Sequence, residues 1–182
     1  PTNYFWLGVE HLLSGLDHLL FVFGLIFLVS GVSTLIKTVT AFTISHSITL
    51  GLSVFEVIKL PQSTAEALIA LTLIYLAIEV SNNLKYKTTP WLIAFGFGLL
   101  HGFGFAGALS EIGFASENLL FSLLFFNLGI ETGQLLLLPL FGLIVWCFRR
   151  VKIEKISYQL SSYFIGGMGS FWLIDRLIKI II

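Results

Sequence analysis

All four histidines of this chain lie in apolar stretches, and the first two each follow an acid. Glu10-His11 and Asp17-His18 stand seven positions apart, with Ser14 between them. On a continuous helix these five residues share one face, because residues three, four and seven apart stack along the helix. Ionisable side chains at membrane depth are costly and indicate function by default, so this stripe predicts a functional site.

The other two histidines are His46, within Thr43-Ile-Ser-His46-Ser47, and His101, within Gly98-Leu-Leu-His101-Gly102. Imidazole is the commonest protein ligand for transition metals such as nickel, cobalt and zinc. The pattern predicts a metal or proton site between the first, second and fourth apolar spans. Its structural alternative is that membrane histidines only bond across helices to hold the packing.

His11 and His18 would lie about 10 Å apart along a continuous helix. We therefore expect one of them to join His46 and His101, and the other to form an entrance site or a contact behind the ligands. Asp17 either ligates the ion directly or accepts the far ring N–H of a ligating histidine and fixes its tautomer.

Further polar residues lie in the same spans. Asn127, Glu131 and Gln134 fall on one helical face, with either a buried hydrogen-bonded role or a place along a permeation path. Ser63-x-x-Glu66 after Pro61 predicts a capping box, which explains Glu66 without a site. The predicted metal residues are His11, Asp17, His18, His46 and His101, and the predicted supporting polar path is Glu10, Ser14, Thr43, Ser47, Asn127, Glu131 and Gln134.

Composition sets the class of protein that must position these groups. The chain is 57% hydrophobic and only 11% charged, against about 25% charged residues in soluble proteins. It is therefore predicted to be an integral membrane protein, and it carries no basic surface for nucleic acid. The lone Cys147 excludes an internal disulfide and a metal site built on cysteines. Because the chain opens with Pro1, we expect an upstream signal peptide or domain.

Crossing a bilayer takes about 20 apolar residues, and six stretches qualify. We predict an all-α, polytopic bundle forming one transmembrane domain over residues 1–182, with Pro90 in the first turn of the fourth span. A seventh span is possible if Pro139 divides the fifth. The predicted spans are 8–30, 34–57, 64–83, 90–110, 118–147 and 157–180.

The placement of lysine and arginine predicts the orientation, because cytoplasmic loops carry the excess. With both termini outside, the inner loops hold Lys37, Lys85, Lys87, Arg149, Arg150, Lys152 and Lys155, and the outer side holds Lys59, Arg176 and Lys179. The N-out, C-out arrangement is thus favoured, and we expect the bacterial inner membrane as the location. Close packing at Gly98 and Gly102 is expected to bring His101 within reach of the first two spans.

Five motifs together resemble the HupE/UreJ family of hydrogenase and urease accessory membrane proteins. They are His11-x5-Asp17-His18, Thr43-x2-His46-Ser47-x-Thr49-Leu, Glu66-Ala-x-Ile-Ala-Leu, Phe97-Gly-x2-His101-Gly-x-Gly-Phe-Ala and Phe126-Asn-Leu-Gly-x-Glu131-x-Gly-Gln134, within about residues 8–140.

That family is regarded as nickel or cobalt permeases, with the His-Asp-His motif as the metal-handling element. The resemblance implies that His11, Asp17, His18, His46 and His101 line the metal path, with Glu131 as a matching acid. Leu12 stands where many members have proline. The chain looks closer to the branch found as a C-terminal membrane module of larger extracytoplasmic proteins, which fits the start at Pro1.

Three functions follow as hypotheses. The first is a permease or metal-binding module for a divalent transition metal, nickel first and cobalt next, driven passively, by ion coupling or by another subunit. The second is a zinc-dependent intramembrane hydrolase, in which three histidines, Asp17 or Glu131, and Ser47 hold zinc and an activated water. The third is a structural subunit of a larger complex. Expected partners are the lipid bilayer, the ion, an upstream extracytoplasmic domain and, in an oligomer, further copies.

Overall fold

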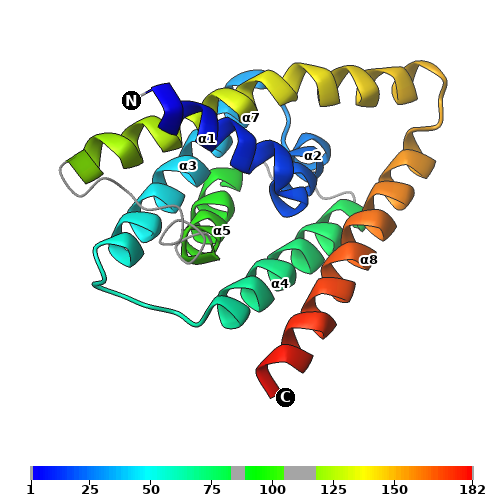
Figure 1. Ribbon diagram of the computed structural model, residues 1–182. Helices are drawn as coiled ribbons and strands as arrows, with labels where there is room; N and C mark the ends of the chain where they lie inside the picture. Colours follow the sequence, from blue (N-terminus) through cyan, green and yellow to red (C-terminus); the bar gives the residue numbers. More distant parts are fainter. Residues whose placement is uncertain (1, 83–88, 105–117, 182) are drawn as a thin grey trace.

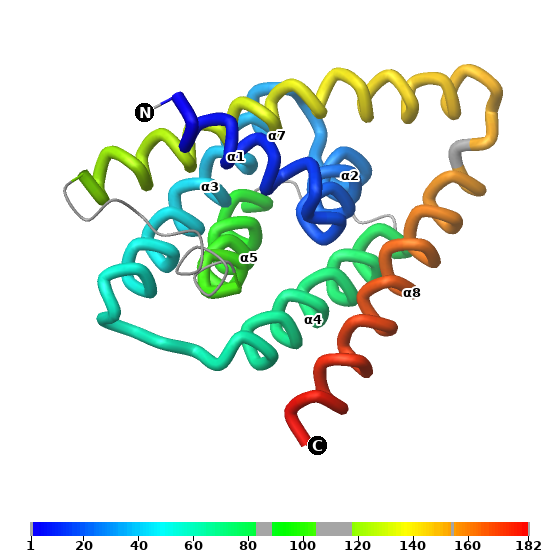
Figure 2. Tube along the Cα trace, in the orientation of Figure 1, coloured from blue at the N-terminus to red at the C-terminus, as the bar shows by residue number. Residues whose placement is uncertain are grey.

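The computed structural model describes residues 2–82, 89–104 and 118–181, and within these ranges the chain is all-helical with no strand, as predicted. The helix α7 crosses one side of the molecule, and α1 lies along its N-terminal half (Figure 1). α4 and α8 pack against each other on the opposite side, and α3 packs against α5 (Figure 2). The bounds are α1 Thr2–Ser14, α2 Leu16–Leu28, α3 Val32–Val54, α4 Gln62–Ser81, α5 Pro90–Gly104, α7 Leu119–Arg150 and α8 Glu154–Ile181.

The first predicted span is two helices rather than one. α1 and α2 meet at Gly15 with a bend of 73°, where the backbone is extended, with φ −80° and ψ 93°. The N–H of Gly15 donates to the carbonyl of His11 (2.9 Å), and its own carbonyl accepts from the N–H of Leu19 (3.1 Å). The break therefore leaves this peptide paired. The continuous stripe expected from Glu10 to His18 is wrong, because the two halves point along different axes.

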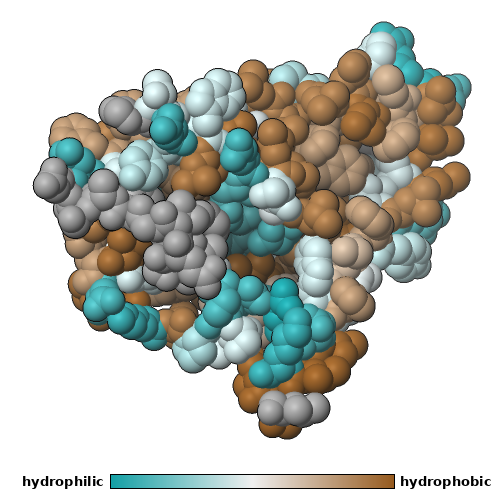
Figure 3. Space-filling model, viewed as in Figure 1, coloured by the Kyte–Doolittle hydropathy of each residue, from teal (hydrophilic) through white to brown (hydrophobic). Residues whose placement is uncertain are grey.

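Of the six predicted membrane spans, the described helices support three or four. α3, α4 and α7 are long and apolar enough to cross a membrane, and the bent pair of α1 and α2 makes a fourth candidate. α5 has 15 residues, fewer than the roughly 20 needed, and the predicted end of its span at 105–110 lies outside the described residues, as do Lys85 and Lys87. α8 has 28 residues but is less apolar and is not among these candidates. Apolar side chains cover much of the surface over α7 and α8 (Figure 3).

The helix starts and the proline in α7 test two local predictions. α5 begins at Pro90, as predicted. α4 begins after Pro61 without a side-chain cap, and Glu66 instead forms an ion pair with Arg176 of α8, so the predicted capping box is wrong. α7 continues through Pro139 for 32 residues, which makes the fifth span a single helix and gives no seventh span from this division.

Glycines bring helix backbones together at two helix crossings. A Cβ on Gly98 or Gly102 of α5 would meet the backbone carbonyl of Phe42 or His46 in α3, which confirms the predicted close approach. A second crossing was not anticipated: a Cβ on Gly129 of α7 would meet a backbone carbonyl of α1, and one on Gly8 of α1 would meet a carbonyl of α7. These contacts fix α1 on α7 and α5 on α3.

Two apolar clusters flank the space between these helices. The larger one gathers residues of α2, α3, α4, α7 and α8 around Phe21 and Phe42. The smaller one consists of Leu12, Leu50, Leu123, Phe126 and Ile130. Leu12 is fully buried and lies against Gly133 of α7. Leu12 thus fills the core between α1 and α7.

Candidate metal centre

The four histidine side chains meet between the two apolar clusters. The ring centroids are 4.8 Å apart for His11 and His18, 5.3 Å for His18 and His101, 5.9 Å for His18 and His46, and 6.3 Å for His11 and His46. The side chains of His18, His46 and His101 are buried, with 3%, 0% and 1% of their surface exposed. Imidazoles from α1, α2, α3 and α5 therefore share one enclosed space.

The bend at Gly15 explains why His11 and His18 are neighbours. On a straight helix they would be separated by about 10 Å along the axis, and only one was expected to join His46 and His101. Because α2 turns away from α1, both rings lie beside His46. His18 also lies beside His101, and the division into one ligand and one entrance residue stays a prediction.

Potential metal donors form two overlapping groups. His11, His18 and His46 make one, and Asp17, His18 and His101 make the other; in each, the donor atoms lie within 4.8 Å of one another. A four-coordinate ion with bonds of about 2.1 Å separates its donors by roughly 3.4 Å. A modest inward movement would let either group close on an ion. His18 belongs to both.

His101 is held through one ring nitrogen by a hydroxyl of α4. The hydroxyl of Thr72 donates to the carbonyl of Ile69 at 2.7 Å, and its oxygen lies 3.1 Å from Nε2 of His101. Since the single hydroxyl proton is already used, Nε2 is the donor in this contact. The opposite nitrogen, Nδ1, then carries a free lone pair.

His46 and His18 are held in the same manner through Nδ1. The amide nitrogen of Asn127 donates to the carbonyl of Leu123 at 2.8 Å, so its Oδ1 faces Nδ1 of His46 at 3.4 Å as an acceptor. The carboxylate of Asp17 accepts from Nδ1 of His18 at 3.3 Å. In both histidines the lone pair therefore resides on Nε2.

Three ring nitrogens consequently have no hydrogen-bond partner among the described residues: Nε2 of His18, Nε2 of His46 and Nδ1 of His101. Buried polar atoms are paired in the great majority of cases, so three neighbouring exceptions call for a ligand. Metal-bound histidines characteristically anchor one nitrogen and present the other. The donor set fits a transition metal that prefers imidazole.

Aromatic rings shield the centre. Phe42 lies edge-on to His101 at 5.2 Å and stacks with His46 at 6.0 Å, and Phe126 lies 5.5 Å from His11. Burial among such rings lowers the local dielectric and strengthens the interaction of an ion with its ligands.

The predicted polar face of α7 points at α3. Glu131 accepts a hydrogen bond from Thr40 at 2.7 Å, and the Oε1 of Gln134 accepts one from Thr43 at 2.9 Å. Together with the contact between Asn127 and His46, these bonds form a polar column that starts at the histidines.

Three other predicted path residues have local roles here. Glu10 is exposed, Ser14 donates to the carbonyl of His11 at 3.3 Å, and Ser47 donates to the carbonyl of Thr43 at 2.7 Å. None of the three belongs to either donor group.

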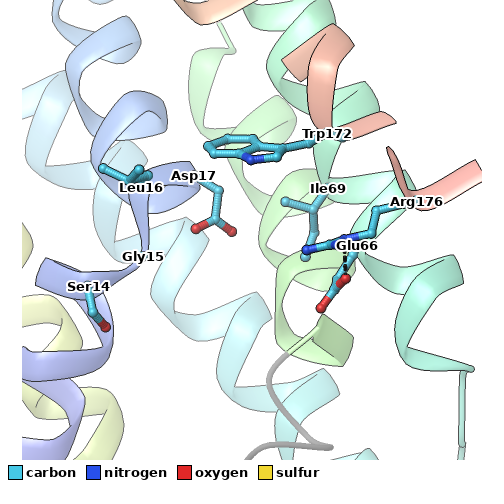
Figure 4. A pocket seen from close by; sticks show the side chains of 9 residues that line it. Ser14, Gly15, Leu16, Asp17, Glu66, Ile69, Trp172 and Arg176 are labelled. Carbon is cyan, nitrogen blue, oxygen red and sulfur yellow. Dashed lines mark ion pairs between the residues drawn. The ribbon is translucent and has the colours of Figure 1, made fainter. Parts of the chain in front are cut away.

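A pocket of about 310 Å³ lies beside Asp17. Figure 4 shows the carboxylate of Asp17 directed into the space between α2 and α4, with the ion pair of Glu66 and Arg176 on the far side and Trp172 alongside. Ser14, Gly15, Leu16, Ile69 and Ala70 complete the lining. Asp17 thus links the surface pocket to the buried histidines.

Sequence reasoning missed several of these residues. Thr72 and Thr40 are threonines in apolar helices, and such residues give no signal by themselves. Arg176 was predicted only as a charge on the outer side, and the packing of α8 on α4 reveals its partner. The glycine at position 15 was the one available signal for the break, because glycine weakens a helix interior.

A comparison with protein-family profiles shows which family the chain belongs to. The profile of the HupE / UreJ protein family matches residues 1–176. The chain belongs to the HupE/UreJ family. No curated protein and no solved structure gave a significant match. HupE/UreJ membership implies a nickel or cobalt accessory or permease-like role, and with the apolar helices it identifies a membrane protein.

Proposed function

We propose that this protein is a membrane permease, or a metal-binding membrane module, that handles a divalent transition metal through His11, Asp17, His18, His46 and His101. The observation that carries the proposal is the convergence of four imidazoles and Asp17 in two donor groups that share His18, each with its donor atoms within 4.8 Å of one another. Imidazole donors restrict the ion to metals such as nickel, cobalt, zinc and copper. Among these metals we propose nickel first and cobalt next, which membership of the HupE/UreJ family supports.

Transport requires that the ion be able to leave as well as bind. The two donor groups share His18, so an ion can pass from Asp17 and His101 toward His11 and His46 without losing all of its ligands at once. Asp17 and Asn127 accept from the ring N–H groups of His18 and His46 and so orient these two rings. This overlap favours passage over permanent retention.

The pocket beside Asp17 is the proposed entrance. A hydrated cation meets the carboxylate of Asp17 there, opposite the ion pair of Glu66 and Arg176. The polar column along α3 and α7, with Thr40 and Glu131, is the proposed continuation. Six spans with both termini outside, the bacterial inner membrane, and attachment to an upstream extracytoplasmic domain complete the proposal.

The decisive experiment measures nickel and cobalt uptake in cells that express the wild type or His18→Ala at equal levels. Because His18 belongs to both donor groups, its loss should reduce accumulation to the level of cells without the protein. Leu13→Ala, an exposed position of α1, is the control and should leave uptake unchanged.

Elemental analysis of the purified full chain accompanies the uptake assay. We expect bound nickel or cobalt in the wild type and a marked loss in His18→Ala. Equal accumulation in both strains would remove His18 from the path. Absence of any metal under all loading conditions would favour the structural-subunit hypothesis, and firmly held zinc without uptake would favour the hydrolase.

A further inference from the structure

We infer that Thr72, contributed by α4, is a positioning residue that makes Nδ1 of His101 a metal donor, whereas His18 and His46 bind through Nε2. The inference rests on the proposed function, because it concerns the donor set of the same centre. It adds α4 to the helices that define how the ion is held.

The contact leaves little freedom to the imidazole of His101. Its Nε2 lies 3.1 Å from the hydroxyl of Thr72, and that hydroxyl donates to the carbonyl of Ile69 at 2.7 Å. Both side chains are buried, so water does not compete for either group.

The opposite tautomer would be penalised at both nitrogens. With the proton on Nδ1, Nε2 and the hydroxyl oxygen would face each other as acceptors unless the hydroxyl abandoned Ile69. The N–H at Nδ1 would also have no acceptor among the described residues, and an unpaired buried donor is costly. With the proton on Nε2, the only unpaired feature is the Nδ1 lone pair, which is the group an ion uses.

The choice of nitrogen changes where the ion sits. Nδ1 lies nearer to the backbone than Nε2, so an ion bound there approaches α5 itself. Gly98 and Gly102 already bring α5 against the backbone of α3, which carries His46. His101 shares its donor group with Asp17 and His18 of α2, so binding through Nδ1 suits an ion held between α5 and α2.

The position of Thr72 is itself fixed by packing. α4 is held to α8 along its length, and Ser162 of α8 donates to the carbonyl of Ala77 at 2.7 Å. The hydroxyl that faces His101 is thus presented by a supported helix. Thr72 touches the histidine and not the proposed ion, so its effect is on orientation and protonation.

Three variants test the inference in the purified full chain. Thr72→Val keeps the shape but removes the hydroxyl, and Thr72→Ser keeps the hydroxyl. The matched control is Thr38→Val, because Thr38 is a fully buried threonine whose hydroxyl donates only to the carbonyl of Thr34 in its own helix (2.7 Å). Calorimetric titration with Ni²⁺ should show affinity lowered about 10- to 100-fold in Thr72→Val, largely restored in Thr72→Ser, and unchanged in Thr38→Val.

The second readout needs no metal. Nitrogen-15 NMR of histidine-labelled, metal-free protein distinguishes the two neutral tautomers, and His101→Gln identifies the signal of His101. We expect the proton on Nε2 in the wild type and in Thr72→Ser, and a mixture of tautomers in Thr72→Val. This spectrum of the wild type and of Thr72→Ser decides the matter even if Thr72→Val does not fold.

The outcomes separate the two proposals. A wild-type His101 protonated on Nδ1, or a folded Thr72→Val with wild-type affinity and tautomer, would overturn the role of Thr72. A wild type that binds neither Ni²⁺ nor Co²⁺ but shows the expected tautomer would instead overturn the proposed function and leave Thr72 as the residue that orients His101.

Discussion

The segment from Thr2 to Leu28 and the helix α7 each contain a residue that disfavours helix, yet they respond differently. The first bends by 73° at Gly15, whereas α7 runs for 32 residues through Pro139. Intrinsic propensities favour the opposite result, since a central glycine costs about 1 kcal/mol relative to alanine and a proline about 3 kcal/mol. Tertiary contacts, rather than local propensity, decide which helix breaks.

At Gly15 the break brings groups together. It places His11 against His18, and the peptide of Gly15 stays paired on both sides of the bend. α7 instead supplies a continuous support: Gly129 lets α1 approach closely, and Asn127 and Gln134 bond to α3. A bend within that stretch would separate these contacts. Pro139 lies beyond them in the chain at an exposed position, away from the contacts of α7 with α1 and α3.

The largest effect is expected from Gly15→Ala. A Cβ at this position would lie 2.9 Å from Nδ1 of His18 and 3.1 Å from Oδ1 of Asp17, and alanine also favours a continuous helix. Both effects displace the shared histidine. Nickel affinity should therefore fall by more than the roughly 10- to 100-fold typical of residues behind the ligands, as measured by calorimetric titration.

Gly142→Ala is the matched control for that variant, because a Cβ on Gly142 of α7 would meet nothing within 4 Å. Its affinity should equal that of the wild type. If Gly15→Ala bound nickel as tightly as the wild type, the bend at Gly15 would not be needed for metal binding. The difference between the bent segment and the continuous α7 would then have no bearing on function.

An intermediate effect is expected from Asn127→Leu, which removes from α7 the acceptor for Nδ1 of His46. The imidazole would lose its orientation, and nickel affinity should fall about 10-fold, at the lower end for such residues. Thr132→Val, at an exposed threonine whose hydroxyl bonds within α7, should leave the titration unchanged. Equal affinities for the two variants would restrict α7 to a purely supporting role.

The smallest effect is expected from Pro139→Ala. The substitution restores a backbone N–H in a helix that is already continuous, so metal affinity should not change and the melting temperature should rise slightly. Thermal unfolding in detergent, followed by circular dichroism, measures this. A pronounced loss of nickel binding would show that Pro139 shapes the centre after all.

The class of fold was predictable from the sequence, and so were most helix bounds. Apolar length marked α3, α4 and α7, the proline at position 90 marked the start of α5, and Gly98 with Gly102 marked its contact with α3. These features depend on local chemistry that a sequence displays directly. The capping box at Glu66 failed because local sequence does not display its competing partner, Arg176, which is more than one hundred residues away along the chain.

The candidate centre was predictable in its members but not in its arrangement. A histidine in an apolar helix identifies itself by type, so all four could be named in advance. The proximity of His11 to His18 depends on a bend whose direction is set by α7, and the donor nitrogen of His101 depends on a threonine in another helix. Such pairings arise from three-dimensional packing, and no single stretch of the chain encodes them.

The spread of the donors over α1, α2, α3 and α5 has a mechanical consequence. An ion held among them would act as a staple between segments otherwise joined mainly by apolar packing, and at one hundred times its dissociation constant it would add about 2.7 kcal/mol to the stability of the folded bundle. Tight binding also slows release of the ion, so a transporter built in this way must bind its metal weakly enough to release it. The stability of the helical bundle would then rise or fall with the concentration of available metal.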